Sequence, residues 1–105
     1  MVAVAAGLLL LAGTARAQQQ PISGLAEAAS SGFLRGFTKA CVDAMGASNY
    51  GKLYCPCVAA FISDRFTIDE ASDSQMMSSA ESMEKVHPGI TNLMKVCAMA
   101  AKPTN

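Results

Sequence analysis

Four cysteines constrain this chain more than any other feature of its sequence. Cys55 and Cys57 are separated only by a proline, Cys41 lies fourteen residues before Cys55, and Cys97 lies forty residues after Cys57. A one-residue spacer does not suit a disulfide, and positions two apart on a helix point about 200° away from each other. Each thiol of the Cys-Pro-Cys segment is therefore expected to pair with a different distant cysteine. Two connectivities remain, and we favour Cys41–Cys55 with Cys57–Cys97, because Cys55 lies nearer the first expected helix.

The first seventeen residues have the pattern of a cleavable secretory signal peptide. Residues 2–15 form an almost unbroken apolar run that is too short to span a bilayer, and Ala15-Arg16-Ala17 has the small-x-small form of a cleavage site. No Lys or Arg precedes the run, so the usual positive n-region is absent. We expect a periplasmic or secreted protein, a location where disulfides persist.

Cleavage would leave 105 − 17 = 88 residues, which we divide into a flexible polar tail over residues 18–22 and one domain over residues 23–102. A single core is marginal at this size, so covalent crosslinks are expected. Without Arg16 the chain carries 8 − 1 = 7 basic and 8 acidic residues. Such a balance argues against a nucleic-acid partner, which needs a basic face. No stable membrane span is expected after cleavage.

The apolar spacing predicts an all-α fold with four helices and no strand. The first helix is expected over residues 23–44, and residues 47–52 are expected to form a loop. Pro56 suits a first helical turn, so the second helix is predicted to start near Cys55 and to end at residue 66. The third is predicted over residues 67–86 and the fourth from residue 90 to just before Pro103.

Local signals support several of these helix ends. Gly46 is a plausible C-cap, and the segment Thr67-Ile68-Asp69-Glu70 fits a capping box. The segment His87-Pro88-Gly89 is expected to end the third helix. Gly32 and Gly36 weaken the first helix, and we expect close packing of another helix to explain them.

Methionines dominate the candidate binding residues. A partner-binding surface is predicted on the third and fourth helices at Met76, Met77, Met83 and Met94, although flexible core filling explains methionine at helical spacing equally well. A soft-metal site for Cu(I) is the alternative, because thiolate, thioether and imidazole ligands suit that ion. Its candidate ligands are Cys55, Cys57, His87 and Met94. Otherwise His87 is expected to be a solvated cap, and no metal or other cofactor is expected.

Catalytic motifs are missing from the sequence. The only histidine has no Ser, Cys or Asp in a recognisable motif around it, and no Gly-rich phosphate loop occurs. Redox exchange normally uses two residues between its cysteines within a βαβ pattern, and neither is present. We therefore expect a protein that is not an enzyme.

The chain resembles small secreted bacterial helical proteins of the "C…YCxC…C" type, which are largely uncharacterised. The resemblance is carried by Phe33-Leu34, Cys41, Tyr54-Cys55-x-Cys57-Val58, Phe66-Thr67-x-x-Glu70 and Cys97, and it implies a helical fold and a compartment outside the cytoplasm. Residues 57–64 and the segment Pro88-Gly89-Ile90-Thr91 are similar to a helix and a turn of Rap1a/Tai-type periplasmic immunity proteins. By size and architecture alone, the chain also resembles HdeA-like acid-stress chaperones.

These observations favour a monomer or homodimer that binds another protein. It would act as an immunity protein or inhibitor, or as an accessory subunit of an envelope complex. The first alternative is a periplasmic Cu(I)-binding protein. The second is an acid-stress chaperone, which would use carboxylate protonation to loosen its fold and expose apolar surface.

Overall fold

The structure is a computed structural model that describes residues 20–102. The predicted signal peptide over residues 1–17 and the first two residues of the predicted tail lie outside the described residues. The elements, in chain order, are the 3₁₀-helix η1 (Ile22–Gly24) and the α-helices α2 (Glu27–Ala44), α3 (Asn49–Arg65), α4 (Ile68–Ser72), α5 (Ser74–Met77), α6 (Ala80–Val86) and α7 (Ile90–Ala101). No strand occurs between residues 20 and 102. The all-α class is confirmed.

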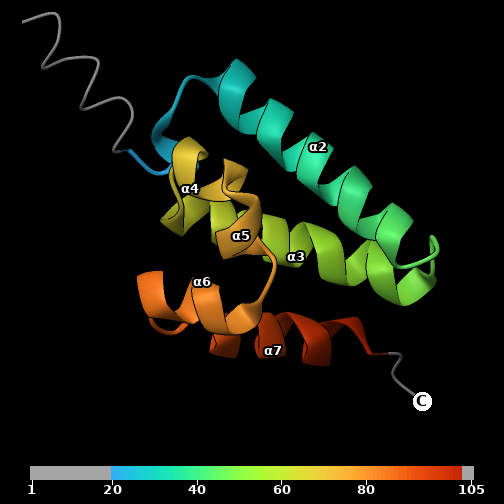
Figure 1. The fold of residues 1–105 in the computed structure, drawn as a ribbon. Coiled ribbons are helices and arrows are strands. Elements are labelled where there is room, and N and C mark those ends of the chain that lie inside the picture. Colours follow the sequence, from blue (N-terminus) through green and yellow to red (C-terminus); the bar gives the residue numbers. More distant parts are fainter. Residues whose placement is uncertain (1–19, 103–105) are drawn as a thin grey trace, which may run out of the picture.

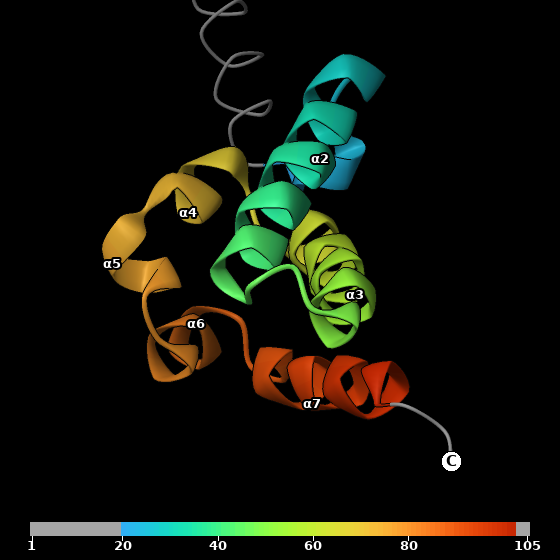
Figure 2. The same ribbon diagram turned by 90° about the vertical axis from the view of Figure 1, so that its right-hand side faces the viewer.

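The three longest helices form a base, and α3 lies between the other two (Figure 1). The helix α2 packs on one side of α3, and α7 packs on another side and runs in the opposite direction to α3. The chain between α3 and α7, residues 67–89, carries the three short helices α4, α5 and α6. We call this segment the arc, because it curves away from the end of α3 and returns to the start of α7 (Figure 2).

The hydrophobic core lies where α3, α7 and the arc meet. Its fully buried members include Phe66, Ile62 and Ile90, each with at most 1% of its surface exposed. Phe33 and Phe37 of α2 pack against this cluster from outside and remain partly exposed. The helix α2 has no buried residue, so it covers the core without entering it.

The segment before α2 is anchored to the core. Ile22 is fully buried, and its backbone N–H donates to the carbonyl of Phe66 at 2.9 Å. The tail that we predicted to extend through residue 22 therefore ends before Ile22. The first helix also begins at Glu27 rather than at residue 23, because the chain first makes the turn of η1.

The end of α2 matches its sequence signal. Gly46 has φ of +70°, its N–H donates to the carbonyl of Asp43, and the N–H of Ala47 donates to the carbonyl of Val42. These two bonds form a Schellman motif, which satisfies the last carbonyls of a helix. Gly46 thus ends the helix as predicted.

The start of α3 differs from the prediction. The helix begins at Asn49, so Pro56 lies in its interior and residues 49–52 are helical rather than a loop. Ser48 caps the new start, since its hydroxyl accepts from the N–H of Gly51 at 3.0 Å. Pro56 has no N–H that could donate to the carbonyl four residues earlier. Because Pro56 is exposed, water can donate a hydrogen bond to that carbonyl instead.

The predicted third helix consists of α4, α5 and α6. Thr67 and Glu70 form the predicted capping box at the start of α4. Two further caps interrupt the segment: the Asp73 carboxylate accepts from the N–H groups of Gln75 and Met76, and the Ser79 hydroxyl accepts from that of Ser82. Short polar side chains compete in this way with continuous helical bonding.

Gly32 and Gly36 do not mark a close helix contact. Both are exposed, and a methyl group built at either position meets no atom within 4 Å. The expectation that another helix packs against them is wrong, because α3 lies against a different side of α2.

Replacing these two glycines should stabilise the protein. Gly32→Ala and Gly36→Ala are each expected to raise the free energy of unfolding by about 0.5–1 kcal/mol. Alanine loses less backbone freedom than glycine when the chain folds into a helix, and at these exposed positions it causes no steric clash. Urea denaturation followed by circular dichroism measures the change. Gly46→Ala is the matched control and should destabilise, since its φ is +70°. A loss of stability in the first two variants would contradict this packing of α2.

Candidate functional site

The two disulfides have the favoured connectivity. Cys41 is bonded to Cys55 and Cys57 to Cys97, with Cα–Cα separations of 5.7 Å and 5.6 Å. Because Cys55 and Cys57 both lie on α3 and point in different directions, the first bridge ties α3 to α2 and the second ties it to α7. All three helices of the base are therefore covalently connected, and the arc contains no cysteine.

The methionines that we predicted to bind a partner are divided between the core and its edge. Met76 and Met83 belong to the buried cluster. They are therefore not exposed, contrary to the predicted partner-binding surface. Met77 and Met94 are partly buried and pack against the same cluster. The reason is the fold of the arc, which turns the apolar side of α5 and α6 toward α3 and α7.

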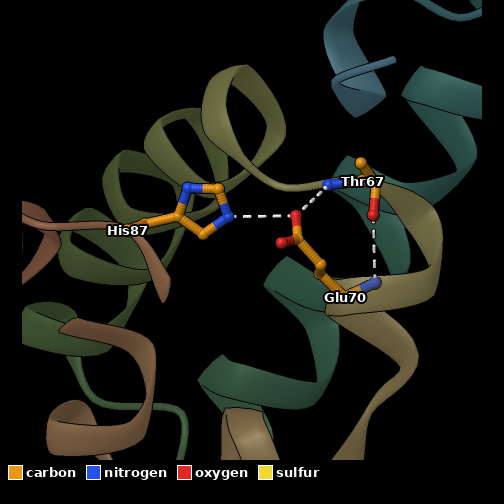
Figure 3. Close-up of polar contacts among 3 residues, drawn as sticks. All are labelled: Thr67, Glu70 and His87. Atoms are coloured by element: carbon orange, nitrogen blue, oxygen red, sulfur yellow. Dashed lines mark hydrogen bonds and ion pairs between the residues drawn. The ribbon is translucent and has the colours of Figure 1, made fainter. Parts of the chain in front are cut away.

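A polar cluster joins the two ends of the arc (Figure 3). The Glu70 carboxylate oxygen Oε1 accepts from the Thr67 N–H at 2.9 Å and lies 2.9 Å from His87 Nε2. In return the Thr67 hydroxyl accepts from the Glu70 N–H at 3.1 Å. Since an ionised carboxylate can only accept, Nε2 carries the proton in this contact. Glu70 thus caps α4 and at the same time holds the residue that ends α6.

The His87 ring is packed rather than solvated. It stacks on the Phe66 ring with centroids 4.2 Å apart, and its side chain is 21% exposed. His87 is the C-cap of α6 as predicted, but its side chain is not solvated. Burial raises the pKa of Glu70, but the hydrogen bonds from the Thr67 amide and from His87 outweigh it and hold that pKa below its ordinary value.

A second carboxylate joins the arc to the base. Gly89, the N-cap of α7, has φ of +97° and no side chain with which to cap the helix. Glu84 supplies the missing acceptor: one carboxylate oxygen accepts from the Gly89 N–H at 2.5 Å and the other from the Thr91 N–H at 3.0 Å. These bonds, first from Gly89 and then from Thr91, hold the pKa of Glu84 below its ordinary value.

This role of Glu84 was not predicted from the sequence. The sequence signal is a glutamate five residues before a glycine N-cap. That spacing predicts the hydrogen bonds only if the turn over residues 87–89 is known to fold back on α6.

The alternative Cu(I) site loses its two thiolates. Cys55 and Cys57 are both in disulfides, and His87 directs Nε2 to Glu70. The sulfur of Met45 lies 3.6 Å from Cys55 Sγ as a non-bonded contact, because a disulfide sulfur has no proton to donate. No group of three or more His, Cys, Asp and Glu side chains gathers within residues 20–102 in a way that could hold a metal ion.

The most exposed apolar side chains lie on α3 and α7. Met99 is 71% exposed and Val96 is 53% exposed on α7, while Leu53 of α3 is 60% exposed one helical turn before Cys57. Lys95 and Lys102 are also exposed, and the segment from residue 90 to residue 102 contains no acidic side chain. Positions 95, 96 and 99 fall within about 100° of the helix circumference. We call Lys95, Val96, Met99 and Lys102 the α7 face.

Comparisons with known proteins return no relative: no family model matches, and neither the curated proteins nor the solved structures include a match. Within residues 20–102 no pocket is found. Over the same residues, none of the helices combines the length and the apolar character that a membrane crossing requires.

Proposed function

We propose that this chain is a non-enzymatic protein of the periplasm or the extracellular space that acts by binding another protein through the α7 face. Its role would be that of an inhibitor or an accessory subunit of an envelope complex. Two disulfides within one small helical domain are compatible with an oxidising compartment.

One observation supports the α7 face over the predicted methionine surface. Val96 and Met99 are exposed between two lysines, whereas Met76 and Met83 are buried. Isolated apolar side chains are common on protein surfaces, but two on one side of one helix, without any acidic neighbour on that helix, form a coherent patch. The partner that fits them is a protein surface with an apolar centre and an acidic rim.

The binding test uses the natively secreted, oxidised protein as bait in extracts of the organism that encodes it. A captured protein is then purified and titrated against wild type and against variants of the α7 face. Val96→Glu and Met99→Glu are each expected to weaken binding by about tenfold or more, because a buried charge replaces an apolar contact. Added salt is expected to weaken binding further, because Lys95 and Lys102 face an acidic rim.

Val86→Glu is the matched control. Val86 lies on α6, is 47% exposed, and undergoes the same change as Val96. The affinity of Val86→Glu for the captured partner should equal that of wild type. Equal losses of partner affinity in Val86→Glu and Val96→Glu would contradict the proposal. Binding of the α7 face to anionic vesicles would also contradict it, as would a homodimer that buries this face and that Met99→Glu dissociates.

A further inference from the structure

We propose that acid releases the arc, residues 67–89, from the base, while both disulfides keep α2, α3 and α7 together. This inference is independent of the proposed partner binding, because it concerns a different part of the molecule. It rests on how two carboxylates fasten the arc and on where the disulfides lie.

The first fastening closes the arc upon itself. Glu70 lies in the first turn of α4, and His87 lies seventeen residues later at the end of α6. The single oxygen Oε1 accepts from both Thr67 N–H and His87 Nε2. When that carboxylate takes up a proton it becomes a weaker acceptor, and both the cap of α4 and the bond to His87 weaken together.

The second fastening holds the arc to the base. Glu84 of α6 accepts from the N–H of Gly89, the N-cap of α7 and the last residue of the arc, and from the N–H of Thr91 in the first turn of α7, and the second of these bonds joins the arc to the base. Gly89 has no side chain that could replace it. Protonation of Glu84 therefore weakens the acceptor at the start of α7, and with it the polar contact between α6 and α7.

Once these contacts weaken, the arc is held mainly by the burial of Met76 and Met83 and by the stacking of His87 on Phe66. Its helices contain five, four and seven residues, which is too short for independent stability in water. Each short helix packs mainly against the next one along the chain. The disulfides connect only helices of the base, so they do not prevent the arc from opening.

The direction of the pH effect follows from the two carboxylates. Both have a folded-state pKa below the ordinary value of 4.5. Their contribution to stability is therefore present above about pH 4.5 and is lost as the pH falls through the folded pKa. Among residues 20–102, His87 is the one titratable side chain that acts on Glu70, and no charged side chain acts on Glu84.

Other charged groups on the neighbouring elements do not change this result. The remaining charged side chains of α3, the arc and α7, together with Lys102, are exposed and contribute to neither shift: Lys52, Asp64, Arg65, Asp69, Asp73, Glu81, Lys85, Lys95 and Lys102.

Methionine oxidation can report the opening. Met76 and Met83 lie on the arc and are buried, whereas Met99 of the base is 71% exposed and serves as the internal reference. The full protein, with both disulfides formed, is treated with hydrogen peroxide at about pH 6 and about pH 3. Formation of methionine sulfoxide is followed by mass spectrometry. The rates at Met76 and Met83, relative to Met99, should rise at the lower pH, because protonation of the two carboxylates favours the open arc.

Variants assign the effect to its two carboxylates. In the double variant Glu70→Gln and Glu84→Gln, both methionines should already be oxidised faster at about pH 6, and the acid response should shrink. Glu81→Gln is the matched control, because Glu81 is an exposed glutamate of α6 that makes no side-chain hydrogen bond among the described residues. It should behave as wild type.

Three outcomes would overturn the proposal. The first is equal protection of Met76 and Met83 at both pH values. The second is an acid transition that also abolishes the helical circular dichroism of the base, because this would be global rather than local unfolding. The third is an equal response of Glu81→Gln and of the double variant Glu70→Gln and Glu84→Gln. The wild-type measurement decides the first two even if the double variant does not fold.

Discussion

Replacing Cys57 and Cys97 together by alanine is expected to lower the free energy of unfolding by about 4 kcal/mol, which follows from closing a loop of forty residues. Domains of this kind have only about 5–15 kcal/mol in total. The loop contains the whole arc. Loss of the disulfide also removes the covalent link between α7 and α3. Urea denaturation followed by circular dichroism measures the loss.

The pair Cys41 and Cys55 provides the control. Its loop spans fourteen residues, so the corresponding double alanine variant should lose about 3 kcal/mol. The difference between the two variants should persist when both are measured in the same oxidising buffer. A larger loss for the shorter loop would contradict the view that the bridge to α7 constrains the chain most.

Phe66→Ala is expected to lower the free energy of unfolding by about 3–5 kcal/mol, the range for removing a buried aromatic ring. Phe66 is fully buried, and its ring supports that of His87. Its carbonyl accepts the N–H of Ile22, which anchors the segment before α2. The substitution therefore leaves a cavity where η1, α3 and the arc meet. Thermal and urea denaturation measure the effect.

Phe61→Ala is the comparison for this substitution. Phe61 is partly buried, and the Arg65 guanidinium lies 5.4 Å from its ring centroid near the surface. Because less apolar surface is removed and water can fill the space, this variant should lose clearly less stability than Phe66→Ala. Equal losses would show that Phe66 does not have the central position in the core that the structure gives it.

Several features were predictable because their signals are local in the chain. The spacing of the four cysteines limited the pairing to two connectivities, and the position of Cys55 favoured the observed one. Thr67 and Glu70 contain their capping box within four residues, and Gly46 marks the end of α2 by its own conformation. The two caps form between residues that are close in sequence, whereas the bridge between Cys57 and Cys97 spans forty residues and was predictable only because the local Cys-Pro-Cys spacing leaves few pairings.

Other features were not predictable because distant contacts decide them. Pro56 is a weaker indicator of a helix start than the cap at Ser48, and an exposed interior position tolerates it. His87 meets Phe66 and Glu70 across separations of 21 and seventeen residues (87 − 66 = 21; 87 − 70 = 17). The burial of Met76 and Met83 likewise depends on the path of the arc, which helical spacing along one segment does not reveal.

The α7 face and the two titrating carboxylates lie on different segments of the chain. The α7 face belongs to the base, which the disulfides hold, whereas the titrating carboxylates belong to the arc. A variant such as Met99→Glu should therefore alter binding without changing the acid response, and Glu84→Gln should have the converse effect. This separation makes the two proposals independent in experiment.

The disulfide pairing determines which helices form the base and which segment is left outside the crosslinks. The direct test is fragmentation mass spectrometry of natively oxidised protein, alkylated before digestion, with backbone cleavage between Cys55 and Cys57. The expected result is no free thiol, Cys41 linked to Cys55, and Cys57 linked to Cys97. Cys41 linked to Cys57, or four alkylated cysteines, would contradict it.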